Sequence, residues 1–209
     1  MSGCIRYLTP ALPMLALALA ACATAGPRTP MLPVDTAVVD LIAVGDTPYR
    51  PQDVAAFEAL LRMIDAMPRD VTIHVGDIKG GGTPCTDAVF IGQFEYLKNV
   101  TGALVLTPGD NEWTDCHLDY TGGYDATERL SYLRELFYVD DRSLGTEPIR
   151  VEQQSRLDDR FTTFVENARG RQNGVRFVTA HVVGSNNGLD RTIPGALAEY
   201  TSRNAASKT

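Results

Sequence analysis

The sequence is poor in histidine, cysteine and basic residues. Its 209 residues include three histidines, four cysteines and one tryptophan, with 19 Lys and Arg against 26 Asp and Glu. No basic cluster is present, and an acidic chain repels a phosphate backbone, so we expect no nucleic-acid partner. Internal repeats and low-complexity tracts are also missing. A composition of 44% hydrophobic and 22% charged residues suits one globular domain with appendages.

The apolar run at residues 11–21 is too short to span a bilayer as a mature helix. With Arg6 before it and small residues after it, residues 1–21 form the pattern of a secretory signal peptide. The end of this segment, Leu19–Cys22, resembles a bacterial lipobox, in which the cysteine is acylated. The alternative is ordinary signal cleavage with an incidental cysteine. The lipobox predicts a lipoprotein of the bacterial cell envelope that faces the periplasm and is held to the membrane at Cys22.

Two cysteines remain for the folded domain, because Cys4 lies in the signal segment and Cys22 in the lipobox. In an oxidising periplasm an isolated pair usually forms a disulfide. Cys85 and Cys116 each follow an acidic corner by a few residues, so their loops can meet on one sheet edge. We predict a Cys85–Cys116 disulfide, with two free thiols as the alternative.

Residues 22–36 contain three prolines and few structure formers, so an extended tether is expected before a domain at residues 37–209. Periodicity within the domain predicts strands that alternate with amphipathic helices. The stretch from Asp140 to Arg160 shows no clear period. The predicted strands are Val38–Val44, Val71–Val75, Leu104–Leu106, Phe161–Val165 and Val175–Val183, with a turn over 168–174; the helices lie between Pro51 and Pro68, over Asp87–Leu97, and around Leu130–Phe137.

Three of these strands end in the same way, with glycine followed by aspartate. The corners carry Asp46, Asp77 and Asp110, and the last occurs in the stretch Ala103–Glu112. Any single Gly-Asp is more often a turn or a helix cap than a ligand. Parallel strands would bring the three carboxylates to one rim, where they repel each other unless a cation lies among them. The pattern therefore predicts a metal site.

The series GDTPY, GDIKGGG, PGDNEW and VTAHVVGSNN resembles the calcineurin-like metallophosphoesterases, which include the purple acid phosphatases. The resemblance implies an α/β fold, a sandwich of β-sheets flanked by helices, and a site for two divalent ions (Fe, Mn or Zn). It makes Asp46 the first metal ligand and Asp77 the bridging ligand. Asp110 takes the place of the family's Asn ligand, Asn111 that of the catalytic His, and His181 that of the lone His ligand.

The sequence also departs from the family pattern. No His follows Asp46 at the usual spacing, and Gly80 stands where purple acid phosphatases have a Tyr ligand. Asn111 is an amide, which donates a hydrogen bond but delivers no proton near neutral pH. The final Gly-His-x-His motif is missing. The resemblance therefore implies a member that is truncated at its C-terminus.

Other polar residues near these motifs have two interpretations each. His74 alternates with apolar residues and is expected to be a sheet residue rather than a ligand. His117 is either a surface histidine or a substitute ligand or acid. Lys79 either contacts a phosphate or is solvated. Ser185, Asn186 and Asn187 are either oxygen ligands and substrate contacts or a turn.

Two functions from different classes remain. The first is hydrolysis of a phosphoester or phosphorylated small molecule through a two-metal site. The second is a non-catalytic envelope lipoprotein that binds a partner or phosphorylated ligand with a degenerate metal site. Preservation of three acidic corners favours the first, whereas Asn111 and the missing histidines favour the second.

Overall fold

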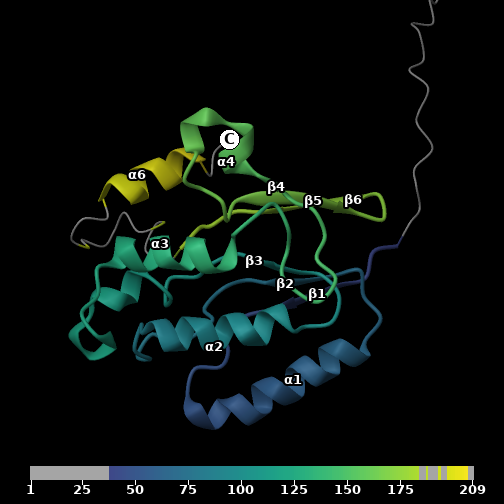
Figure 1. The fold of residues 1–209 in the computed structure, drawn as a ribbon, viewed down its shortest axis with the longest axis horizontal. Coiled ribbons are helices and arrows are strands. Elements are labelled where there is room, and N and C mark those ends of the chain that lie inside the picture. Colours follow the sequence, from purple (N-terminus) through teal and green to yellow (C-terminus); the bar gives the residue numbers. More distant parts are fainter. Residues whose placement is uncertain (1–37, 184–186, 188–192, 194–196, 207–209) are drawn as a thin grey trace, which may run out of the picture. The chain divides into compact units, whose positions relative to one another are not determined.

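The computed structural model describes residues 38–183, 187, 193 and 197–206, all within the compact unit Asp35–Thr209. The first sheet is parallel, with the order β1 (Leu41–Val44), β2 (Val71–His74), β3 (Leu104–Leu106). Helices α1 (Val54–Ala66) and α2 (Asp87–Lys98) connect these strands and lie on one face of the sheet (Figure 1). The strand order β1-β2-β3 means that both connections step across the sheet in the same direction. Because such crossovers are right-handed, both helices lie on the same face of the sheet.

Alternate residues of the first sheet face two different layers. Ile42, Val44 and Leu106 belong to a cluster that contains Phe57 of α1 and Phe90 of α2. Residues on the opposite face contact the second sheet. The members of this second cluster are Val71, Ile73, Ala103 and Val105 from the first layer and Ile149, Val151, Ala168 and Phe177 from the second. The β2 and β3 strands are thus covered on both faces, as parallel strands normally are.

The second sheet is antiparallel, with the order β4 (Glu152–Gln153), β5 (Ala168–Gln172), β6 (Val175–Thr179). The β5–β6 connection is Asn173–Gly174, whose φ angles of 43° and 85° suit a two-residue hairpin turn. The predicted turn over 168–174 is therefore wrong for its first five residues. Pairing with β6, rather than local composition, makes this stretch a strand.

The predicted strand Phe161–Val165 is also wrong. A short 3-10 helix, Asp159–Phe161, ends there, and Phe161 and Phe164 pack in a cluster with Ala206. The stretch 140–160, which showed no period, contains β4, α4 (Gln154–Leu157) and bridges from Leu144 to Leu104 and from Arg142 to Arg150. These elements are short and held by distant partners, so they leave little periodic signal in the sequence.

Two further helices within the described residues are α3 (Ala126–Phe137) and α6 (Leu197–Ala206), and further 3-10 turns there cover Pro51–Asp53, Thr114–His117 and Asp119–Thr121. The Asp125 carboxylate caps α3 by accepting hydrogen bonds from the main-chain N–H groups of Thr127 and Glu128. The predicted α/β class is confirmed by these elements.

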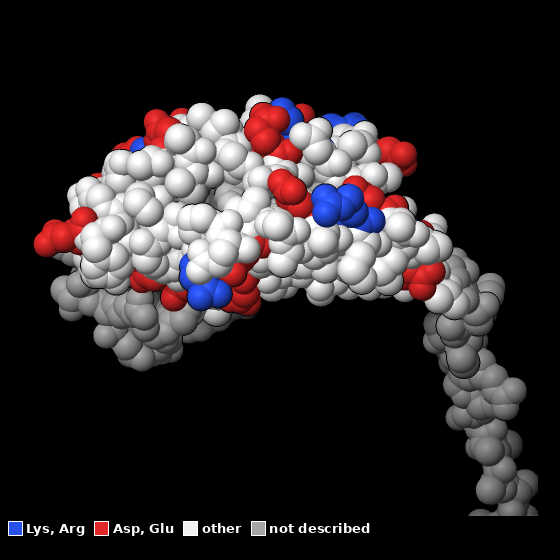
Figure 2. Space-filling model, turned by 90° about the horizontal axis from the view of Figure 1, so that it is seen from below, with Lys and Arg blue, Asp and Glu red and all other residues white. Residues whose placement is uncertain are grey.

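None of the helices in the described part is long and apolar enough to cross a membrane. Figure 2 shows the face on which α1 lies, where acidic side chains are scattered and the basic ones are isolated from one another. No basic patch is visible on that face.

Candidate functional site

The three acidic corners lie at one edge of the first sheet, because β1, β2 and β3 are parallel and each is followed directly by its Gly-Asp pair. The main-chain N–H of Asp46 donates to the carbonyl of Gly76 (3.2 Å), which joins the first corner to the second. A Cβ on Gly76 would lie 2.1 Å from the main-chain nitrogen of Gly109. The second and third corners therefore approach backbone to backbone, and Gly76, with φ of 88°, is the residue that permits this contact.

The Asp77 carboxylate contacts the corners on both sides. Its Oδ1 accepts hydrogen bonds from the main-chain N–H groups of Asp110 (3.1 Å) and Asn111 (3.2 Å). Its Oδ2 accepts from the hydroxyl of Tyr49 (3.2 Å). Burial raises the pKa of Asp77; the hydrogen bond from Asn111 opposes this shift, and the charges of Asp110 and Asp46 add to it. A cation at this corner would relieve the repulsion between the carboxylates.

Tyr49 joins two of the predicted ligands. Its hydroxyl donates to Asp46 Oδ1 at 2.6 Å, lies 3.2 Å from Asp77 Oδ2, and accepts from Asn111 Nδ2 at 3.2 Å. A phenol has one proton, so at any moment it donates to one carboxylate, and Asp46 is the closer. Burial and the hydrogen bond to Asp46 raise the pKa of Tyr49 well above its usual value. Reasoning from sequence missed this residue, although it belongs to the GDTPY corner.

Asn111, predicted at the catalytic position, is buried between the corner loops. Its Nδ2 donates to the Tyr49 hydroxyl and to the main-chain carbonyl of Lys79 (3.1 Å). Asn111 belongs to the third corner loop, and its amide thus joins this loop to Tyr49 of the first corner and to Lys79 after the second. This arrangement positions the amide beside the carboxylates, where it can hydrogen-bond an anionic oxygen.

Glu112 is a second residue that sequence reasoning missed. Its side chain is fully buried, and its Oε1 accepts from the main-chain N–H groups of Gly109 (2.7 Å) and Asp77 (3.1 Å). Within the described part of the chain, its Oε2 has no hydrogen-bond partner. Burial raises the pKa of Glu112 to about 8, so the group is largely protonated at neutral pH. Glu112 therefore holds the second and third corners together as a neutral acid.

Lys79 is buried rather than solvated, so the solvated interpretation is wrong. Its ammonium donates to the carbonyls of Gly80 (3.1 Å) and Thr83 (3.0 Å). Burial lowers the pKa of Lys79, and the charges of nearby acids such as Asp115 and Asp77 oppose that shift. Lys79 is therefore an internal basic group beside the acidic corners, and its hydrogen bonds hold the glycine-rich loop.

His181 lies beside the loop that follows the third corner, where its ring contacts Trp113. It follows β6 rather than belonging to it, because the predicted strand Val175–Val183 ends at Thr179, opposite Ala168. The imidazole is buried, with its ring 5.7 Å from that of Trp113. Its Nδ1 lies 3.0 Å from Glu166 Oε1.

Glu166 fixes the orientation of His181. It is buried and pairs with Arg134 at 2.6 Å as well as with the imidazole. Burial acts to raise the pKa of Glu166, but the bonds to His181 and Arg134 together lower it to about 2, so the group is ionised. Donation from Nδ1 to this carboxylate leaves Nε2 as the basic nitrogen, the arrangement of histidines that bind metal.

The other two histidines are held by main-chain groups. His74 lies in β2 and is buried; its Nδ1 accepts from the N–H of Gly76, and burial lowers its pKa to about 4. The expectation that His74 is a sheet residue is confirmed. His117 ends a 3-10 helix and its Nδ1 lies 2.6 Å from the carbonyl of Thr114. Ser185 and Asn186 are outside the described residues, and Asn187 accepts from the N–H of Val183 (3.1 Å).

The Cys85–Cys116 disulfide is confirmed, with the two Cα atoms 5.6 Å apart. It links the loop after the second corner to the 3-10 helix after the third. The N–H of Cys85 also donates to the carbonyl of Thr121 (2.9 Å). The bond restrains the two loops that carry Lys79 and Asn111.

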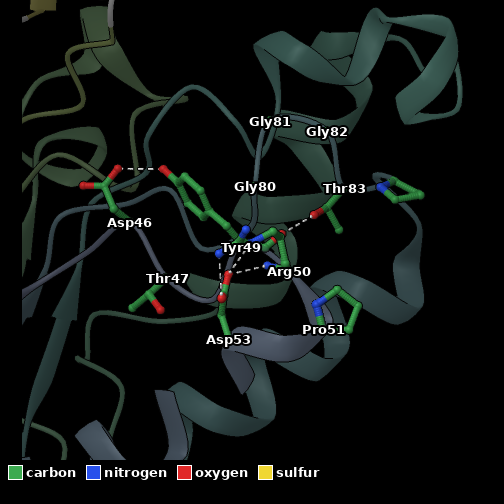
Figure 3. Close-up of a pocket in the computed structure, with 11 residues that line it drawn as sticks. Asp46, Thr47, Tyr49, Arg50, Pro51, Asp53, Gly80, Gly81, Gly82 and Thr83 are labelled. Carbon is green, nitrogen blue, oxygen red and sulfur yellow. Dashed lines mark hydrogen bonds and ion pairs between the residues drawn. The ribbon is translucent and has the colours of Figure 1, made fainter. Parts of the chain in front are cut away.

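A hollow of about 770 Å³ opens beside Asp46 (Figure 3). Its walls come from the first corner and from the glycine-rich loop, and Tyr49 points its hydroxyl from this wall toward Asp46. A Cβ on Gly80 would lie 2.8 Å from the carbonyl oxygen of Tyr49, so glycine is required where the loops meet. Arg50 in the wall forms a two-pronged ion pair with Asp53. The hollow is large enough for a small organic ligand.

Comparisons with known proteins leave the chain unassigned. No family model, no curated protein and no solved structure matches it. Within the described residues, no group of three or more His, Cys, Asp and Glu side chains is arranged to hold a metal ion. The structure brings together Asp46, Asp77 and the main chain of Asp110, with His181 in the adjoining layer.

Proposed function

We propose that the acidic edge of the first sheet is the site of a metal-dependent phosphoesterase of the calcineurin-like type. The observation that supports this most directly is the Asp77 carboxylate, which accepts hydrogen bonds from Tyr49 on one side and from Asp110 and Asn111 on the other. A carboxylate in that position is suited to bridging two ions. Two packed sheets with helices outside the first are the coarse architecture that this fold needs, and the calcineurin-like type is part of the proposal.

The donor types suit a divalent ion, but the side chains would have to close around it, since no three of them in the described residues are arranged for a metal. Asp46 and Asp77 supply carboxylate oxygens that converge on one hydroxyl group, and Asp110 adds a third acid at the same edge. His181 would add the single nitrogen, through the ring atom opposite Glu166. Carboxylate oxygens suit Mn, and an imidazole nitrogen beside them suits Fe or Zn. Asp46 and Asp77 would hold one ion, and the second would depend on His181.

A divalent ion bound there would polarise a phosphate ester and make a bound water more acidic. The chain itself contributes positioning. Asn111 holds its amide beside the carboxylates, and Tyr49 fixes the spacing of Asp46 and Asp77. The hollow beside Asp46 receives the phosphorylated small molecule. A lipid anchor at Cys22 would hold this domain on the periplasmic side of the envelope.

The rival is a non-catalytic lipoprotein that binds a partner or a phosphorylated ligand. The specific observation that favours it is the engaged Asn111 amide, which already donates to Tyr49 and Lys79 and carries no transferable proton. Metal content and hydrolysis of 4-nitrophenyl phosphate separate the two. We expect metal to co-purify with the folded wild-type chain and hydrolysis to require it. A folded protein with neither property would support the rival.

A further inference from the structure

Two arginines stand opposite each other in the hairpin formed by β5 and β6. Arg171 is paired in register with Arg176, on either side of the turn Asn173–Gly174. Residues directly opposite in an antiparallel pair have Cβ atoms about 4.5–5.5 Å apart, so two like charges there repel each other. Both residues are exposed, and within the described part of the chain neither side chain forms an ion pair or a hydrogen bond. An anion between the two guanidinium groups would relieve this repulsion.

The alternation of side chains along β6 places its arginine on the outer side of the second sheet. Phe177 packs in the cluster between the two sheets. Its neighbours Arg176 and Val178 therefore point outward, and Val178 is 69% exposed. Arg169, opposite Val178, is neutralised by an ion pair with Glu152. The unpaired positive charge of the hairpin thus lies near its turn, next to an exposed apolar side chain.

The turn of this hairpin lies at the end of the domain where the chain enters from the predicted tether. The Asn173 amide donates to one carboxylate oxygen of Asp70, and the other oxygen accepts from the main-chain N–H of Asp40. The main-chain N–H of Asp70 donates back to the carbonyl of Asp40 (2.8 Å). Figure 1 shows the turn beside the first described residues of the chain. The chain that follows Cys22 therefore reaches the domain beside the arginine pair.

Exposed apolar side chains lie close to these contacts in the sequence. Val38 is 78% exposed, Met67 51% and Leu41 47%, and each is within three positions of Asp40 or Asp70. The acidic corners are at the opposite edge of the first sheet, because they follow its strands whereas Asp40 and Asp70 precede β1 and β2. A negatively charged surface would attract the arginine pair and repel the acidic edge.

We propose that this end of the domain rests on an anionic phospholipid surface, with a lipid phosphate bound between Arg171 and Arg176. Guanidinium groups bind phosphate oxygens through paired, charge-assisted hydrogen bonds, and exposed apolar side chains such as Val178 enter the headgroup region. The predicted acyl group at Cys22 holds the domain close to the bilayer, so weak contacts are enough for docking. The acidic edge then faces the aqueous phase. This inference rests on the anchor of the proposed function and not on its chemistry.

The test measures how fast phenylglyoxal modifies individual arginines of the full chain, reconstituted in vesicles and read by mass spectrometry. Vesicles of phosphatidylcholine alone are compared with vesicles that also contain phosphatidylglycerol. Each arginine near an anionic surface strengthens binding about fivefold, so we expect modification of Arg171 and Arg176 to slow at least about fivefold in the anionic vesicles. Salt at about 1 M should restore the faster rate. Arg160 lies outside the hairpin with a 70% exposed side chain, and its rate should be the same in both vesicles.

Two variants show whether the arginines act as a pair. Arg171→Gln removes one of the two charges and should weaken the protection of Arg176 in anionic vesicles. Arg160→Gln is the matched control and should leave that protection unchanged. Full protection of Arg176 in Arg171→Gln would refute a phosphate held between the two side chains.

The outcomes separate docking from anchoring. Equal rates in the two kinds of vesicle, for a chain that floats with both, would overturn the docking and leave the anchor intact. A chain that floats with neither refutes the anchor and the docking together. Protection that appears only in native membranes, with their proteins present, would indicate a protein partner and overturn the lipid surface. Phosphatase activity enters none of these readouts, so its absence would refute the proposed chemistry alone.

Discussion

Replacement of Asp77 by Asn tests whether this carboxylate bridges the metal site. The hydrogen bonds allow the change, because Asn Oδ1 can still accept from the N–H groups of Asp110 and Asn111. The new Nδ2 would face the Tyr49 hydroxyl, which can accept as well as donate. Burial already disfavours the charged form of Asp77. We therefore expect the metal-free variant to melt at the wild-type temperature or slightly above it.

The effect on metal binding should be large. Bound metal at 100 times its dissociation constant stabilises a protein by about 2.7 kcal/mol, which is roughly 5–10 °C in melting temperature for a domain of this size. Loss of a full ligand charge should weaken binding by at least about 100-fold. At the same metal concentration the variant would then retain only about 0.4 kcal/mol, roughly 1 °C.

The assay is thermal melting of the metal-stripped protein with and without added Mn²⁺, Zn²⁺ or Fe²⁺. Asp46→Asn and His181→Ala each remove a group that serves one ion, so their loss of metal-induced stabilisation should be smaller than that of Asp77→Asn. Asp159→Asn is the matched control, since Asp159 is exposed, and it should respond like wild type. A full wild-type shift in the Asp77 variant would show that Asp77 is not the bridge. No shift in folded wild type would refute the metal site.

Three further predictions concern the framework of the site and its anchor. Glu112 takes up a proton on folding, since its pKa rises from 4.5 to about 8, so the free energy of unfolding of wild type should fall as pH rises through that window. Glu112→Gln should remove this loss when stability is measured by urea unfolding, and the same pH dependence of stability in both proteins would contradict a buried neutral acid. Cys85→Ser opens a loop with a sequence separation of 31 and should cost about 3–4 kcal/mol in urea unfolding, whereas a loss below roughly 1 kcal/mol would show that the Cys85–Cys116 bond adds little. Labelled fatty acid should enter wild type and not Cys22→Ser, and equal labelling would refute the lipobox.

The sequence was enough to predict the parts of this protein that depend on local pattern. Apolar runs that end in Gly-Asp located the first three strands and their acidic corners, and apolar periodicity located α1, α2 and α3. Because parallel strands end at one edge, the meeting of the corners followed from order alone. The Cys85–Cys116 disulfide followed for the same reason, since each cysteine is carried by a loop from one of these corners.

Only the tertiary structure decided how the corners are held. Tyr49 reaches Asp77 across 28 positions and Glu112 reaches the main chain of Asp77 across 35. No periodicity reports such pairs, because each of these side chains is polar and sits in a turn. Burial decided that Lys79 is internal rather than solvated and that Glu112 is protonated. Two strands of the second sheet, β4 and β5, were missed for a related reason. The β5 sequence reads Ala-Arg-Gly-Arg-Gln, and it becomes a strand through pairing with β4 and β6.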